Sequence, residues 1–158
     1  MFRKIKENKI YKSTKTYGHD EGLSCAFRQP EATHSHCSLI HGYSLSFKFT
    51  FGCKELDNKN WVVDFGGLKD LKKWLKDTFD HTLAVDASDV QLKKFQQLEK
   101  DGLCNLKIMD GVGCEKFAEH AFDFADKLIQ QKTENRCWVE EVEVREHGGN
   151  SAIVQKNK

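Results

Sequence analysis

Residues 43–51 decide the fold, and they read Tyr-Ser-Leu-Ser-Phe-Lys-Phe-Thr-Phe. Large apolar side chains alternate here with small or polar ones, which is the period of a β-strand with one buried face. The opposite face is polar, so the pattern predicts an antiparallel sheet whose two sides differ. Gly52 ends the alternation.

Two stretches further along the chain have the period of amphipathic helices. In residues 68–79, apolar side chains recur at steps of three and four between lysines and aspartates. Residues 115–131 repeat this pattern with a stripe that contains Phe117, Phe124 and Leu128. We interpret this stripe as a core-packing face rather than a cofactor-binding surface.

A shorter helix and a loop complete the helical part of the prediction. The helix is expected at 90–100, with Asp89 as its N-cap and Gly102 just past its end. Residues 19–40 lack periodicity and contain the only proline, so they are predicted to form a long loop. A loop of this length in a compact domain usually serves function.

Further strands are expected on both sides of the helical block, at residues 9–18, 137–146 and 151–154. Strands in two groups around a block of helices are typical of an α+β fold, in which helices cover one face of a sheet. The chain of 158 residues is long enough for one such core, so we expect a single domain over 1–158.

Composition excludes several classes of protein. Charged residues make up 31% of the chain, and the net charge of +1 argues against a strongly basic duplex-binding surface. No apolar run approaches the length of a membrane span. Residues 1–6 lack the apolar stretch of a signal peptide, and the six cysteines include no Cys-x-x-Cys pair. We therefore expect free thiols and a cytoplasmic protein without nucleic-acid or membrane partners.

Histidines and a cysteine gather just before the clear strand. His34, His36, Cys37 and His41 fall within eight residues, which is a composition typical of a metal site. A polar surface loop with solvated histidines has the same composition. Cys37 is close enough to His41 to be an active thiolate, or it is a small buried side chain.

Two further places contain carboxylates that suit chemistry. Asp80 and His81 are adjacent, so the carboxylate can orient the imidazole for proton transfer, or Asp80 merely caps the helix end. Glu146 has the same parity as Val142 and Val144, and a buried carboxylate there needs donors or a ligand. Its two oxygens match the paired N–H groups of a guanine or pterin edge. The alternative is that the strand end twists Glu146 into solvent.

From about residue 9 to residue 154 the chain resembles the 6-pyruvoyl-tetrahydropterin synthase and 6-carboxytetrahydropterin synthase family. The matching segments are, in order, Cys37-x-x-x-His41-Gly42, Val62-Val63-Asp64-Phe65-Gly66-Gly67-Leu68-Lys69, Asp80-His81, Cys114-Glu115-x-x-Ala118 and Val142-x-Val144-x-Glu146. The resemblance implies a T-fold: a four-stranded antiparallel sheet with two main helices on one face, in the order β-β-α-α-β-β. It also implies a homo-oligomer with active sites at its interfaces.

The resemblance further implies roles for residues in this chain. Proton transfer would fall to Cys37, Asp80 and His81, while Glu146 would anchor the pterin ring. Arg28 is a candidate for binding the substrate's triphosphate.

A zinc ion held by three histidines is expected of the family. His41 is the matched ligand, and His19 and His36 are candidates for the other two. Tyr43 stands where the second histidine of the family's His-Gly-His motif would be. A rival alignment sets Phe27-Arg28 against the family's His-Arg, which would remove one ligand.

The implied reaction is the loss of triphosphate from 7,8-dihydroneopterin triphosphate, assisted by Zn²⁺. The product would be a pyruvoyl or a carboxy tetrahydropterin, and the biopterin, folate and queuosine (deazaguanine) pathways all stay open. Two other hypotheses are a metal-free T-fold protein that binds a pterin or purine without this reaction, and a structural oligomerisation module.

Overall fold

The fold is built around one long strand, β3 (His41–Cys53), in a computed structural model that describes residues 8–158. One side of β3 pairs with two strands in succession: β2 (Leu23–Phe27) along its first half and β1 (Tyr11–Tyr17) along its second half. Its other side pairs with β6 (Cys137–His147), which in turn pairs with β7 (Asn150–Gln155). All these pairings are antiparallel, as the alternation in residues 43–51 predicts.

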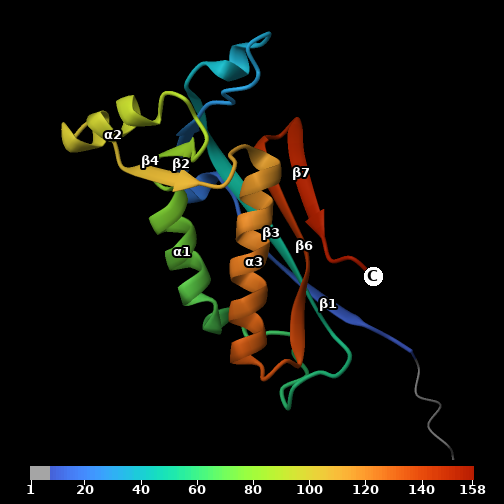
Figure 1. Ribbon diagram of the computed structural model, residues 1–158. Coiled ribbons are helices and arrows are strands. Elements are labelled where there is room, and N and C mark those ends of the chain that lie inside the picture. Colours follow the sequence, from blue (N-terminus) through green and yellow to red (C-terminus); the bar gives the residue numbers. More distant parts are fainter. Residues whose placement is uncertain (1–7) are drawn as a thin grey trace, which may run out of the picture.

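Two helices lie side by side against one face of this sheet (Figure 1). They are α1 (Lys69–Phe79) and α3 (Cys114–Lys132), and they confirm the two amphipathic patterns. Phe79 from α1 packs 4.8 Å from Phe47 of β3, and Phe117 from α3 packs 5.1 Å from Phe79. All three rings are fully buried, and burial of one such ring contributes roughly 1.5–3 kcal/mol. The apolar face of β3 therefore fixes where both helices sit.

A small parallel unit is inserted between the two helices. It consists of β4 (Thr82–Asp86), α2 (Leu92–Lys100) and β5 (Leu106–Met109). β4 pairs with β2 and with β5, in both cases parallel, so the sheet is not antiparallel throughout. β4 is buried on both faces and shows no alternation, which is why strand periodicity does not reveal it. The short helix expected at 90–100 is confirmed as α2.

The prediction of an uninterrupted loop over residues 19–40 is wrong, because it contains β2. Leu23 and Phe27 are buried in this strand, and Ser24 between them is exposed. Five residues are too few for their alternation to stand out. A single-turn 3₁₀ helix, His19–Glu21, and Gly22 with a φ of 72° separate β2 from β1. β1 and β2 together therefore take the place of one long first strand.

The predicted N-cap of the short helix is also wrong, because α2 begins at Leu92 and its N-cap residue is Gln91. Asp89 lies one turn earlier, where its carboxylate accepts the backbone N–H of Gln91 at 2.9 Å. The strands expected at 9–18, 137–146 and 151–154 are confirmed as β1, β6 and β7. With α1 and α3 between β3 and β6, the order is that of a T-fold with an insertion.

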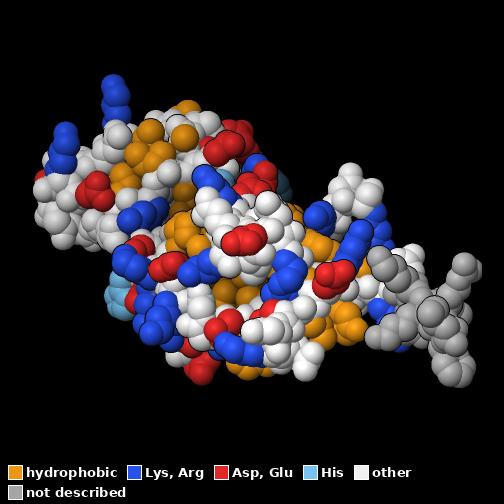
Figure 2. Space-filling model, turned by 90° about the horizontal axis from the view of Figure 1, so that it is seen from below, with side chains coloured by type: hydrophobic (Ala, Val, Ile, Leu, Met, Phe, Trp, Pro, Cys, Tyr) orange, Lys and Arg blue, Asp and Glu red, His pale blue; other side chains and the backbone are white. Residues whose placement is uncertain are grey.

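The surface carries both signs of charge. In Figure 2, Lys and Arg side chains lie among Asp and Glu side chains, with hydrophobic side chains visible between them. All six cysteines have free thiols. Within residues 8–158, none of the helices combines the length and the apolar character that crossing a membrane requires.

Candidate functional site

A polar cluster forms where the start of β3, the start of α3 and the end of β6 meet, at the end of the sheet drawn uppermost in Figure 1. Tyr43 of β3 lies at its centre. Burial is the largest cause that raises the pKa of its phenol, and electrostatic interactions with Glu146, Cys37 and Cys114 raise it further. Four side chains from separate segments of the sequence thus converge.

Cys114 is the buried member of this cluster, and Glu146 lies beside it. Burial, followed by the charge of Glu146, raises the pKa of the Cys114 thiol to about 12, so this thiol stays protonated at neutral pH. Glu146 is half-buried near the end of β6, within the register irregularity between Arg145 and His147 in the pairing with β7. The carboxylate is therefore neither sealed in the core nor turned fully into solvent.

Aromatic rings line the strand pair next to this carboxylate. Phe27 and His41 are direct cross-strand partners in β2 and β3, and their ring centroids are 4.9 Å apart. The ring of Tyr43 lies 5.5 Å from that of His41 and 6.0 Å from that of His147. One imidazole in the strand pair is thus flanked by a phenyl and a phenol ring.

Cys37 lies in the loop that leads into β3. A single-turn 3₁₀ helix, His36–Ser38, carries it, and the Ser35 hydroxyl caps this turn by accepting the backbone N–H of Cys37 at 3.2 Å. The thiol is exposed, so the alternative of a small buried side chain is wrong. An exposed thiol beside Tyr43 is available to a bound molecule.

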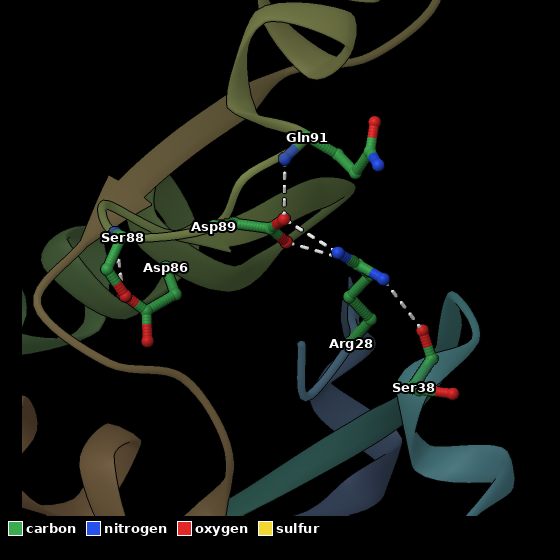
Figure 3. Close-up of polar contacts among 6 residues, drawn as sticks. All are labelled: Arg28, Ser38, Asp86, Ser88, Asp89 and Gln91. Atoms are coloured by element: carbon green, nitrogen blue, oxygen red, sulfur yellow. Dashed lines mark hydrogen bonds and ion pairs between the residues drawn. The ribbon is translucent and has the colours of Figure 1, made fainter. Parts of the chain in front are cut away.

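Arg28 ties this loop to the inserted unit (Figure 3). Its Nε and one terminal nitrogen donate to the two carboxylate oxygens of Asp89 at 2.8 and 2.6 Å, and its other terminal nitrogen donates to the carbonyl of Ser38 at 3.2 Å. The Asp89 side chain is 1% exposed and that of Arg28 is 20% exposed. In this arrangement Arg28 holds the residue next to Cys37 in place, and its guanidinium is already neutralised.

The ion pair between Arg28 and Asp89 should make stability depend on pH. Hydrogen bonds from Arg28 hold the pKa of Asp89 below its ordinary value. The stabilisation is therefore present above about pH 4, the unfolded value, and is lost as pH falls through the lower folded pKa. We expect Asp89→Ala to lower the free energy of unfolding at pH 7 by about 2 kcal/mol, because it leaves a half-buried guanidinium unpaired.

Urea unfolding of both proteins between pH 3 and pH 7 checks this expectation. The difference between wild type and Asp89→Ala should shrink towards pH 3. Asp101→Asn at the end of α2 is the control and should leave the curve unchanged. A difference that stays constant with pH would show that the ion pair is not its cause.

Asp80 and His81 form a close pair at the end of α1. His81 Nδ1 is 2.6 Å from an Asp80 carboxylate oxygen, and the His81 side chain is 88% exposed. His81 has a φ of 55°, a left-handed conformation that residues other than glycine adopt rarely and that is found at functional sites. The imidazole of His81 is exposed while the Asp80 carboxylate is half-buried. Among the interactions of residues 8–158, none joins this pair to the cluster at Tyr43.

The histidines predicted as metal ligands do not gather in this chain. His19 lies in the turn between β1 and β2, where its ring Nδ1 meets the backbone carbonyl of Ser44. His36 is in the single turn beside Cys37, and the His41 Nδ1 is 2.8 Å from the carbonyl of Leu39. Across residues 8–158, no three His, Cys, Asp or Glu side chains form a group suited to hold a metal ion. The donor set at the strand pair therefore does not fit the zinc that the resemblance implies.

Several residues of the cluster have no sequence pattern that predicts a functional role for them. Cys114 belongs to a matched segment, but a thiol at the start of a helix carries no signal of its own. Phe27 enters only through the alignment that sets Phe27-Arg28 against the family's His-Arg. The cross-strand pairing of Phe27 with His41 favours that alignment. His147 follows Glu146 directly, and only the ring contact with Tyr43 distinguishes it.

These features define a class of protein: a T-fold with a polar site at the ends of its strands. Comparison with known proteins agrees with this assignment of the fold. A family model described as 6-pyruvoyl tetrahydropterin synthase matches residues 17–157. The chain therefore belongs to the 6-pyruvoyl tetrahydropterin synthase family, a family of lyases.

Individual relatives share limited sequence identity with this chain. A 6-carboxy-5,6,7,8-tetrahydropterin synthase of Rickettsia bellii is 37% identical over 57 residues, 35% of this chain and 41% of that protein. The chain spans less than half the length of the rickettsial relatives it matches. A protein of the same name from Aquifex aeolicus is 27% identical over 134 residues, 82% of this chain and 78% of that protein.

Solved structures share the fold. An uncharacterised protein from Wolinella succinogenes superposes with a TM-score of 0.77 at 17% identity, covering 95% of this chain and 100% of that one. The 6-pyruvoyl tetrahydropterin synthase of Plasmodium vivax gives 0.68 at 16% identity, covering 96% of this chain and 100% of that one.

Proposed function

We propose that this protein is a lyase that binds 7,8-dihydroneopterin triphosphate and eliminates its triphosphate. The observation that carries the proposal is the convergence of Glu146, Cys37 and Tyr43 at one end of the sheet, in a chain of this family. The names of the relatives from Rickettsia and Aquifex support a tetrahydropterin product.

Glu146 is proposed to bind the pterin ring. A pterin offers two parallel N–H donors on one edge, and a carboxylate accepts both with charge-assisted hydrogen bonds. The half-buried position of Glu146 suits this role, because the carboxylate is reachable yet partly removed from water. The flanking rings of Tyr43 and His147 add apolar surface for the heterocycle.

Cys37 is proposed to take up a proton from the substrate side chain. When a base removes a proton from the carbon next to the one that bears triphosphate, the C–H electron pair forms a C=C bond and the C–O electron pair leaves with the triphosphate. In this role Cys37 acts as its thiolate, and its exposure to solvent and its electrostatic interaction with Tyr43 support the role. Arg28 is proposed to position the Cys37 loop through Ser38, and it would reach a phosphate only by releasing Asp89.

Asp80 and His81 are proposed to complete the site of a neighbouring copy in a homo-oligomer. Their hydrogen bond at 2.6 Å orients the imidazole, and the 88% exposed His81 side chain presents it outward. A proton relay made from two chains would explain why the exposed His81 keeps a left-handed backbone conformation. Zinc is not part of this scheme, because the donor set at the strand pair does not fit it.

Incubation with 7,8-dihydroneopterin triphosphate, with products identified by mass, tests the proposed function. We expect release of triphosphate and a pterin product that lacks it. Substrate recovered unchanged from folded protein would contradict the lyase activity. If the unchanged pterin nevertheless bound, the chain would be a binding protein of the same fold.

A further inference from the structure

We propose that the strand pair β2–β3 of this chain holds no zinc, because Phe27 and Tyr43 occupy two of the three positions from which this family's histidines would bind it. The inference rests on family membership and on geometry, and it does not depend on the proposed reaction.

The three positions form one contiguous set. Phe27 and His41 are direct partners across an antiparallel pair, so their side chains lie on the same face. Tyr43 is two residues further along β3 and shares that face. The ring centroids are 4.9 Å apart for Phe27 and His41, 5.5 Å for His41 and Tyr43, and 6.2 Å for Phe27 and Tyr43. Three imidazoles placed here would converge.

The side chains actually present cannot replace three imidazoles. Catalytic zinc takes three protein ligands from His, Asp, Glu or Cys. Phe27 has no donor atom, and the phenol of Tyr43 is not among the usual zinc ligands and lies beside Glu146. His41 remains, and its Nδ1 is 2.8 Å from the carbonyl of Leu39, which leaves Nε2 as its one free ring nitrogen. One nitrogen ligand is too few to hold a catalytic zinc ion.

No other histidine supplies the missing ligands within the chain. His19 lies against the main chain at Ser44, whose side chain faces away from the side of β3 that carries His41 and Tyr43. His36 lies outside the strand pair. In the described part of the chain, no three His, Cys, Asp or Glu side chains lie together in a way that could hold a metal ion.

The rings of Phe27, His41 and Tyr43 therefore form an aromatic wall at the place where the family's zinc ion would be bound. Phe27, His41 and Tyr43 offer ring faces and edges, with a single imidazole to make a polar contact. A bound molecule would meet this wall by packing and one hydrogen bond, so chelators should have no effect on its binding.

Zinc content tests the inference directly. Protein is stripped with a chelator, exposed to excess zinc, desalted and analysed for metal by mass spectrometry. We expect wild type and His41→Ala to retain the same amount, far below one ion per chain. The double variant Phe27→His/Tyr43→His should gain about one ion per chain. His41→Ala in that background should remove it.

Cobalt provides a second readout, because tetrahedral Co²⁺ gives intense visible absorption bands that loosely held surface metal does not. These bands are expected in the double variant and not in wild type. The inference is overturned if wild type retains about one zinc per chain that His41→Ala loses. It is also overturned if the double variant folds, as judged by its thermal unfolding, and gains no metal. The comparison of wild type with His41→Ala decides the matter even if the double variant is unstable.

Discussion

Replacing Cys37 by alanine should lower the turnover of 7,8-dihydroneopterin triphosphate by about 10³-fold, the usual contribution of a positioned acid–base group. The affinity for the pterin should stay nearly the same. The reason is geometric: Glu146 lies on β6, while Cys37 lies on the exposed turn His36–Ser38, so the thiol can be removed without changing the ring-binding carboxylate. Release of triphosphate measures turnover, and a pterin fluorescence titration measures affinity.

Cys104→Ala is the matched control for this prediction. Cys104 is also a free thiol, but it is half-buried between α2 and β5, where it packs against the buried side chains of Leu83, Val85 and Phe95. Its replacement should leave turnover unchanged. Near-normal turnover of Cys37→Ala would show that another group moves the proton, and an equal loss of affinity would place Cys37 in ring binding.

The second large effect is expected for Glu146→Gln. The amide keeps the shape of the side chain but loses the charge and turns an N–H donor towards a ring edge that itself donates. Loss of two charge-assisted hydrogen bonds should weaken pterin binding by about 100-fold. Fluorescence titration of the two proteins with the same pterin measures this ratio.

Glu143→Gln is the control on the same strand. Glu143 accepts hydrogen bonds from Arg145 and Ser151 and has the opposite parity, so its replacement should not alter pterin binding. Unchanged affinity in Glu146→Gln would exclude Glu146 as the ring anchor. Absence of any pterin binding in wild type would instead favour a structural oligomerisation module.

The sequence predicted those helices and strands that have one buried face and one face exposed to solvent. β3, α1 and α3 each have such a face over many residues, so period alone located them. β4 is buried on both sides and β2 is very short, and neither has a pattern long enough to stand out. Parallel pairing of β4 depends on contacts between distant segments that no local pattern encodes.

The site was predictable as a set of residue types but not as an arrangement. Cys37, His41 and Glu146 could be named because reactive side chains at a loop–strand junction and a carboxylate at a buried parity are unusual. That Arg28 is bound to Asp89 could not be foreseen, since 61 positions separate them and either alone is an ordinary charged residue. The role of Phe27 depended on a register that only the pairing of β2 with β3 decides.

A crystal structure of the assembled protein with a bound dihydropterin tests the central claim most directly. The ring should place its N–H edge on Glu146, with its side chain towards Cys37 and against the aromatic wall of Phe27, His41 and Tyr43. A pterin bound elsewhere would contradict this account, for example in the cavity of about 610 Å³ that Tyr11, Trp61 and Phe65 help to line.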